Sequence, residues 1–343
     1  MVFLKDTILK ELQTNPVTQQ MIHFGNNIGN LFPNEEALCL ASAFQMDKKT
    51  RIVVKKNRYE AQQLYQRLQP LVDDALLFVM EESLRVQAIA SSPEDKQEQI
   101  YVLTQLVKED KPRIIVCNTA AFFRYLPDRE LFKSLCFQFE VDQEISMSEL
   151  KRILNRAGYT KVNYVDRPCT YASRGGIVDV YCLEYEHPIR IEFFDIVIES
   201  IRLFHEETQR TIKTIDSVFI NPATDLLFTD EQINYLQKEI DKELEKQQTK
   251  LIPDDYEFLL DYIEKDKISL ENYDIDPHLY IYYSYLKANK LTDYVNGNII
   301  FSSQEEVENG YKKLNEETIT FIQEMVQSHQ YLPKYNMFHD IFK

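Results

Sequence analysis

Glycine is scarce in this chain, which holds seven glycines and no tryptophan in 343 residues. A phosphate-binding P-loop needs spaced glycines followed by Lys-Ser or Lys-Thr, because backbone amides, a lysine and a hydroxyl together hold phosphate and magnesium. None of the seven glycines stands before such a pair, and nucleophile motifs of the GxSxG type are also missing. The sequence therefore predicts neither nucleotide hydrolysis nor serine-based acyl transfer, and we expect no catalytic residues in this chain.

Long apolar runs and clustered metal ligands are lacking as well. No stretch approaches the ~20 apolar residues of a membrane helix, and the first residues do not form a secretion signal. The six histidines are scattered and no CxxC pair occurs. These patterns predict a cytoplasmic protein with free thiols, no membrane association, no metal site and no cofactor. The five cysteines are Cys39, Cys117, Cys136, Cys169 and Cys182.

Positive charge is missing from the last third of the chain. Residues 223–343 carry 12 Lys+Arg against 24 Asp+Glu, whereas residues 1–136 carry 17 of each, and no arginine follows Arg210. Arginine is the side chain that clamps phosphate in two places at once. The last third is therefore a poor nucleic-acid binder and is interpreted as a solvated acidic surface. A basic cluster within 48–58 allows either weak DNA contact or an ordinary solvated face.

The chain divides into three parts by its patterns. In residues 1–136 a short helix within 1–20, which ends near Asn15-Pro16, precedes predicted strands over 51–55, 75–80 and 113–117, which alternate with helices over 59–68 and 93–107. This alternation predicts an α/β domain with a parallel sheet covered on both faces. Ser92-Pro93 looks like the cap of the second helix. The loop from Gly25 to Gly29 stands where a phosphate loop could lie, but it supplies no charge for phosphates.

Residues 137–222 form the second part, a small α+β domain. A capping box at Ser146 begins a helix that stops at Gly158. We expect strands over 161–165, 177–183, 189–194, 198–204 and 218–220. Residues 223–343 are predicted to be mostly helical, with a capping box at Thr229, a short strand over 298–301 and a final helix over 304–327.

The stretch 170–210 has the clearest two-residue periodicity of the sequence. Its segment 189–194 places three apolar residues on one face of a strand and Arg190, Glu192 and Phe194 on the other. An arginine beside an exposed aromatic is typical of interface anchors. The alternative is an ordinary surface strand with one exposed phenylalanine, which proteins tolerate.

The same stretch resembles a known family. Its blocks are T-Y-A-S-R-G-G-I-V-D-V-Y at 170–181, H-P-I-R-I-E-F-F-D at 187–195 and I-E-S-I-R followed by T-Q-R at 198–210. In this order they resemble the UvrB-homologous N-terminal region of the bacterial transcription-repair-coupling factors (Mfd). R-A-G-Y-x-K-V at 156–162, the helix start at 92–94 and Asn-Pro-Ala at 221–223 resemble the same family.

The resemblance implies a fold and a function. It implies a degenerate P-loop, RecA-like domain in two sequence-separated lobes, 1–136 and 223–343, with the UvrA-interaction domain inserted at 137–222. It implies recruitment of UvrA to stalled RNA polymerase in nucleotide-excision repair, with UvrA contacts at Arg174, Arg190 and Phe194. RNA polymerase, DNA, ATP and magnesium belong to further domains of the family, where the ATP-dependent translocase resides. This chain then is a truncated piece of such a protein or a stand-alone relative.

The sequence differs from the family pattern at two places, and two alternative functions remain open. Residues 167–171 read R-P-C-T-Y where the family commonly has Pro-Gly-Glu-Phe, and Ile196-Val197 replace a common acidic turn. Both changes alter hairpin turns that flank the expected docking face. The alternatives are a UvrB-like ATP-dependent helicase, which the missing nucleotide motifs disfavour, and an autoinhibitory clamp that packs on other domains of the full factor. Arg174 also has a structural alternative, pairing with Asp179 or Glu192 within the sheet.

Overall fold

The centre of the fold is a parallel sheet of four strands in the order β12-β1-β3-β2. The structure is a computed structural model that describes residues 2–23, 28–29, 31–83, 93–274 and 276–340. The strands are β1 (Arg51–Lys55), β2 (Ala75–Phe78), β3 (Ile114–Asn118) and β12 (Asn298–Phe301). β1 pairs with both β3 and β12, so a strand from the last third joins the sheet formed by the first third. The expected mixed α/β class with a parallel sheet is confirmed.

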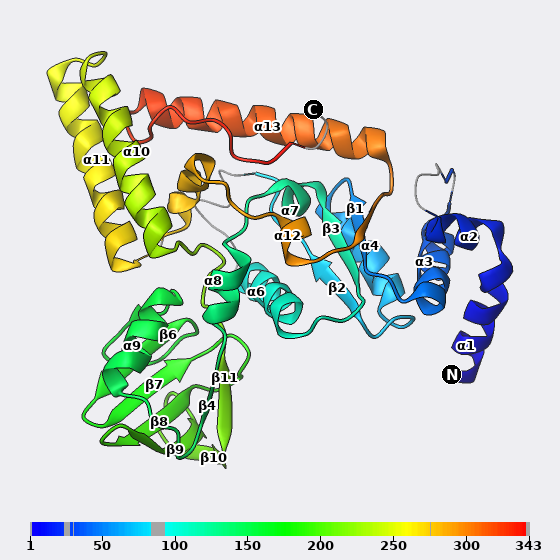
Figure 1. Cartoon of the computed structure of the whole chain (residues 1–343), viewed down its shortest axis with the longest axis horizontal. Helices are drawn as coiled ribbons and strands as arrows, with labels where there is room; N and C mark the ends of the chain where they lie inside the picture. Colours follow the sequence, from blue (N-terminus) through cyan, green and yellow to red (C-terminus); the bar gives the residue numbers. More distant parts are fainter. Residues whose placement is uncertain (1, 24–27, 30, 84–92, 275, 341–343) are drawn as a thin grey trace.

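Helices cover both faces of this sheet, because its strands are apolar on both sides. α3 (Pro33–Asp47) and α4 (Arg58–Leu68) share a core with Val53, which points to one face. α6 (Pro93–Lys108) and α7 (Thr119–Phe123) share another core with Ile52 and Val54, which point to the other face. Figure 1 shows the sheet between these helices. The predicted cap at Ser92 lies outside the described residues.

The N-terminal helix ends near Asn15-Pro16, as predicted. The chain forms α1 (Val2–Glu11) and the 3₁₀ turn η1 (Leu12–Thr14), followed by a helix that was not predicted, α2 (Pro16–Ile22); all three pack on α3. The break is local: Asn15 is extended and its side-chain oxygen accepts the backbone N–H of Val17 at 2.8 Å. Pro16 then takes the first helical position, where its missing N–H costs nothing.

The last third is largely helical, as predicted. α10 (Asp230–Gln248) and α11 (Pro253–Asn272) form a hairpin, followed by the 3₁₀ segment η2 (Pro277–Tyr285), α12 (Leu291–Tyr294) and α13 (Gln304–Gln327). The capping box is confirmed: Thr229 Oγ1 accepts the Gln232 N–H at 3.1 Å, and Gln232 Oε1 accepts the Thr229 N–H at 2.9 Å. α13 packs on α7, so this third closes over the parallel-sheet body (Figure 1).

The second part leaves and re-enters this body through two paired strands. After α8 (Arg129–Ser134), β4 (Phe137–Glu140) runs outward and β11 (Ser217–Ile220) returns beside it in antiparallel register. Phe137 lies opposite Ile220, so the entry and exit of this part are neighbours. Adjacent termini are typical of a unit inserted into another domain.

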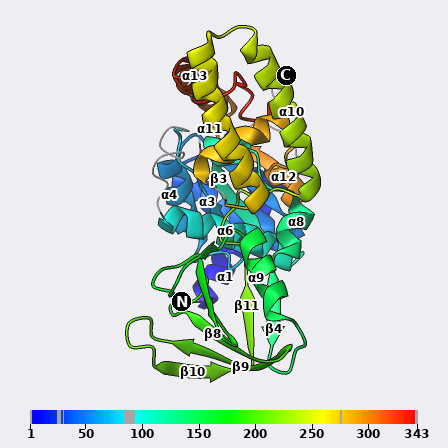
Figure 2. The same cartoon turned by 90° about the vertical axis from the view of Figure 1, so that its left-hand side faces the viewer.

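The inserted part is built on a six-stranded sheet in the order β10-β9-β8-β7-β6-β5. The strands are β5 (Thr160–Lys161), β6 (Thr170–Arg174), β7 (Ile177–Tyr181), β8 (Ile189–Phe194), β9 (Val197–Phe204) and β10 (Thr211–Ile215). Neighbours are antiparallel except β5 and β6. α9 (Met147–Arg156), capped by Ser146, buries Leu150 and Leu154 in the core that holds the inner side of the sheet. β9 and β10 lie at the opposite end of the molecule from the α10–α11 hairpin (Figures 1 and 2).

One strand prediction for this part was wrong, and three strands were missed. The strand predicted over 161–165 is only Thr160–Lys161 in the structure. The Val162 N–H still donates to the Tyr171 carbonyl, but after this bond the chain bends away from β6. β4, β6 and β10 were not predicted. β10 in particular leaves all its residues exposed or half-buried, so it lacks the alternation that marks a one-sided strand. Its pairing with β9 decides its conformation.

Candidate functional site

The outward face of β8 is the first candidate site, and its alternation is confirmed. Ile189 and Ile191 are fully buried and Phe193 is 9% exposed, whereas Phe194 is 75% exposed. Inward residues pack on the core under α9, so the even-numbered residues must face solvent. Phe194 is the most exposed large apolar side chain among the described residues for which burial is given. The fold gains little from keeping an aromatic there.

Arg190 lies on the same face but is held tightly by its neighbours. Its Nε and one terminal nitrogen donate to both carboxylate oxygens of Asp179 on β7, at 2.7 Å each. The same terminal nitrogen donates to Gln209, and the guanidinium lies 4.3 Å from the ring centroid of Phe204. The hydrogen bonds that Arg190 donates to Asp179 raise the pKa of Arg190, although burial lowers it. Only 18% of the Arg190 side chain is exposed, so its geometry is set before any partner arrives.

Arg174 is the last residue of β6 and is exposed. The structure does not give it the two carboxylates considered from the sequence. Asp179 pairs with Arg190, and Glu192 pairs with Arg202 on β9. Arg174 of the R-G-G block therefore presents its charge at the end of β6. Arg190 and Arg202, in contrast, have carboxylate partners within the sheet.

The glycine pair explains how this edge is shaped. Gly175 has a φ of +58°, which residues with a side chain rarely adopt. The Gly176 carbonyl accepts the Phe193 N–H at 2.8 Å, and a Cβ on Gly176 would lie 3.0 Å from the Phe193 carbonyl oxygen. The close approach needs glycine. It ties the β6–β7 turn to the end of β8.

The three expected contact residues lie within one patch. β6 and β8 run in the same direction, and Arg174 is opposite Ile177, which is opposite Glu192. With strand spacings of about 4.8 Å and a rise of about 3.3 Å per residue, Arg174 and Phe194 are about 12 Å apart and Arg190 and Phe194 about 13 Å. An interface of standard size covers about 800 Å² on each partner. One partner surface can therefore reach all three residues.

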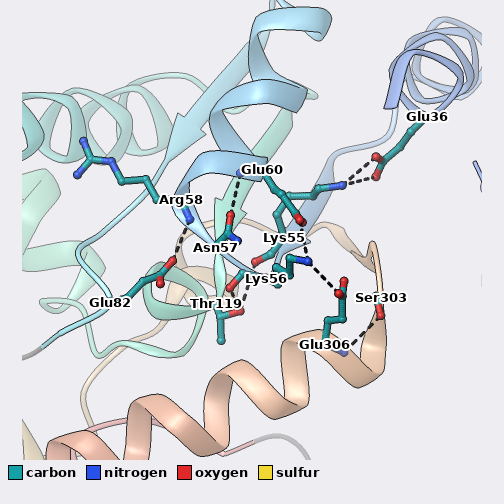
Figure 3. Close-up of polar contacts among 10 residues, drawn as sticks. All are labelled: Glu36, Lys55, Lys56, Asn57, Arg58, Glu60, Glu82, Thr119, Ser303 and Glu306. Carbon is teal, nitrogen blue, oxygen red and sulfur yellow. Dashed lines mark hydrogen bonds and ion pairs between the residues drawn. The ribbon is translucent and has the colours of Figure 1, made fainter. Parts of the chain in front are cut away.

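The second candidate is the carboxyl edge of the parallel sheet, where α/β folds usually bind nucleotides. Figure 3 shows what fills it. Lys55 at the end of β1 lies 2.9 Å from a Glu36 carboxylate oxygen, which belongs to the first turn of α3. Lys56 lies 3.0 Å from Glu60 on α4 and 2.9 Å from Glu306 on α13. Hydrogen bonds to Glu306 and then Glu60 raise the pKa of Lys56.

Three further groups at this edge are also engaged within the chain. The Arg58 guanidinium pairs with Glu81 and Asp95, and the Thr119 hydroxyl donates to the Lys56 carbonyl at 3.0 Å. The Asn57 side chain accepts the Glu60 N–H and caps α4. Carboxylates thus occupy the neighbourhood of these basic side chains, where a nucleotide would bring its phosphates. Of the loop 25–29, only residues 28 and 29 are described.

The basic cluster within 48–58 does not form one surface. Lys48 and Lys49 precede β1, whereas Lys55 and Lys56 end and follow it. A five-residue strand separates its ends by about 13–17 Å. Arg51 between them is fully buried and pairs with Asp47 at 2.8 Å. The neighbouring positions in sequence therefore belong to opposite edges of the sheet, which disfavours a single DNA-contacting patch.

None of the helices in the described ranges is long and apolar enough to cross a membrane. Within the same part of the chain, no three His, Cys, Asp or Glu side chains are grouped as a metal site would require.

Comparison with known proteins addresses the inserted part directly. Residues 137–226 match the family model described as the UvrB interaction domain. The match begins at β4 and ends just after β11, so it contains the sheet, α9 and the outward face of β8.

The wider chain is related to the transcription-repair-coupling factors. It is 32% identical to the factor of Bacillus subtilis over 282 residues, which is 80% of this chain and 24% of that protein. It is 28% identical to the factor of Staphylococcus epidermidis over 308 residues, 88% of this chain and 26% of the relative. The chain thus spans about a quarter of the length of these curated relatives. The similarity reaches well beyond the UvrB interaction domain into the flanking parts.

Proposed function

We propose that this chain is a non-catalytic docking module that recruits UvrA to stalled RNA polymerase in transcription-coupled repair. The observation that carries the proposal is the outward face of β8 within the match to the UvrB interaction domain, where Phe194 is 75% exposed on the same face as Arg190, whose guanidinium is held by Asp179. Exposed aromatics and arginines that are ordered in advance dominate binding energy at interfaces. RNA polymerase and DNA then contact other parts of the full factor.

In this proposal the three residues have different roles. Phe194 enters an apolar depression on UvrA, where its ring leaves water. Arg174, which is exposed, pairs directly with a UvrA carboxylate. Arg190 presents the edge of its guanidinium that Asp179 leaves open, with its position fixed by the bidentate pair. A carboxylate beside a guanidinium that is already ordered binds with a smaller loss of side-chain entropy.

We also propose that the α/β body is a degenerate nucleotide-binding fold that holds no nucleotide. The glycine shortage and the ion pairs of Lys55 and Lys56 at the carboxyl edge support it. A nucleotide would have to displace Glu36 and Glu306 to reach the lysines, and would leave those carboxylates without their partners. The same argument disfavours the helicase alternative.

The test is calorimetric titration of the chain with UvrA of the same organism. We expect the parent chain to bind and Arg174→Ala to bind about 10-fold or more weakly. Arg152 provides the matched control, because it is 57% exposed on α9, on the other side of the domain, and forms an ion pair with Glu149 of the same helix. Arg152→Ala should bind like the parent. Absence of binding by the folded parent, or equal losses for Arg174→Ala and Arg152→Ala, would overturn the docking face.

A further inference from the structure

The turn between β8 and β9 carries a second exposed apolar side chain. Phe194 lies opposite Val197, with Asp195 and Ile196 between them as a two-residue turn. Ile196 is 45% exposed, in addition to the 75% exposure of Phe194 two residues earlier. Two-residue hairpin turns favour Gly, Asn and Asp. Asp195, with a φ of +57°, meets this preference, whereas a β-branched side chain at the next position does not arise from turn chemistry.

The fold itself does not use Ile196 as a core residue. The inward positions at this end of the sheet are taken by Phe193 and Ile198, which are 9% and 0% exposed. Ile196 keeps nearly half of its surface in water, so burial at this site contributes only part of the stabilisation that an isoleucine can give. Its side chain is therefore available to a partner.

The turn is ordered by a neighbouring segment of backbone. The Ile145 N–H donates to the Ile196 carbonyl at 2.7 Å, and the Ile198 N–H donates to the Gln143 carbonyl at 3.0 Å. The Asp142 N–H donates to the Ile198 carbonyl at 2.9 Å. Together with an isolated antiparallel bridge between Glu144 and Val197, these bonds fix the 142–145 segment beside the turn. A turn held on both sides loses little conformational entropy when it binds.

We propose that Ile196 is a second apolar anchor of the docking face, which enters the same apolar depression of UvrA as Phe194. The inference rests on the proposed function and names the shape of the surface that the partner must present. That surface is wide enough for a phenylalanine and an isoleucine from one turn, and it carries a carboxylate on the side that faces Arg174. The β8–β9 turn with Phe194 and Ile196 adjoins the β6–β7 turn that follows Arg174. The two are linked because the Phe193 N–H donates to the Gly176 carbonyl.

The experiment titrates UvrA of the same organism with the parent chain and with Ile196→Ala, Ile196→Asp and Phe194→Ala. Ile212→Ala is the control: Ile212 is 48% exposed in the same domain, on β10 beside the far end of β9 from the turn. We expect a 5–10-fold loss for Ile196→Ala, a larger loss for Ile196→Asp and less than a 2-fold change for Ile212→Ala. Thermal unfolding of each variant checks that the fold is kept.

The outcomes separate this inference from the proposed function. If the parent binds and Phe194→Ala weakens binding, but both Ile196 variants bind like the parent, the second anchor is wrong and the docking face stands. If the parent does not bind, both ideas fail. The double variant Phe194→Ala/Ile196→Ala gives a further check. Two side chains in one depression should show non-additive losses, and strictly additive losses contradict a shared depression.

Discussion

Phe193 and Phe194 are adjacent residues of one type on opposite faces of β8, and they allow the docking face to be tested against the core. Phe193 is 9% exposed and belongs to the core under α9, whereas Phe194 is 75% exposed. We expect Phe193→Ala to destabilise folding by about 3–5 kcal/mol, the usual cost of truncating a buried phenylalanine. Phe194→Ala should leave the free energy of unfolding within about 0.5 kcal/mol of the parent.

The binding effect follows from the same exposure. A phenylalanine offers roughly 200 Å² of surface, so Phe194 keeps about 150 Å² in water in the free chain. At about 25 cal/mol per Å², its complete burial against UvrA contributes up to about 4 kcal/mol. Incomplete burial and the remaining alanine reduce this value, so a loss of about 1.5–3 kcal/mol is expected, or about 10- to 150-fold in affinity.

Urea unfolding followed by circular dichroism gives the first quantity, and calorimetric titration with UvrA gives the second. The titration of Phe193→Ala with UvrA must be done under conditions in which this variant is still folded. Its affinity for UvrA should then match that of the parent. The reasoning is refuted if Phe194→Ala unfolds at markedly lower urea than the parent. It is equally refuted if Phe194→Ala binds UvrA with unchanged affinity while the parent binds measurably.

Three further predictions use other contacts. Arg190→Ala should destabilise folding by about 1–2 kcal/mol, because it leaves the partly buried Asp179 without its bidentate partner; Arg190→Lys should recover only part, and unfolding curves unchanged in both variants would contradict this role. Burial lowers the pKa of His278, but the hydrogen bond to Asp266 and the charges of Asp266 and Asp276 together raise it by more, so the net pKa is raised; the stabilisation is present at acidic pH and is lost as pH rises through the raised pKa. His278→Gln should therefore lose more stability relative to the parent at pH 5.5 than at pH 8.5, and an equal loss at both values would count against the ion pair. Finally, 1 mM Mg-ATP should leave the melting temperature unchanged, whereas a dissociation constant of 10 μM would add about 2.7 kcal/mol.

Much of the site was predictable from the sequence, because it depends on local periodicity. The alternation in 189–194 is enough to divide Phe193 from Phe194, since successive strand residues face opposite sides wherever the strand is placed. The caps at Ser146 and Thr229 were also predictable, because the side chain bonds to a backbone group three residues away. The strands 51–55 and 298–301 were identified individually for the same reason.

Pairing between distant segments was beyond what these local patterns determine. Nothing near Arg190 in the sequence indicates that its guanidinium pairs with Asp179. Strand alternation determines which face of the sheet a residue lies on, but not which residue it pairs with. β10 has no inward row of apolar residues, so only its place beside β9 makes it a strand. The ion pairs that join Lys55 to Glu36 and Lys56 to Glu306 depend on how the sheet and helices meet.

The sequence by itself thus determined the composition of the proposed docking face, its two-residue alternation and the lack of a phosphate-loop motif. The tertiary structure decided which arginine is exposed, how the turn at Ile196 is held, and that the carboxyl edge of the parallel sheet is occupied by ion pairs. The physical reason is the range of the interactions. Alternation and capping act over two to four residues, whereas salt bridges and strand pairing join residues up to 250 positions apart, as in Lys56 and Glu306.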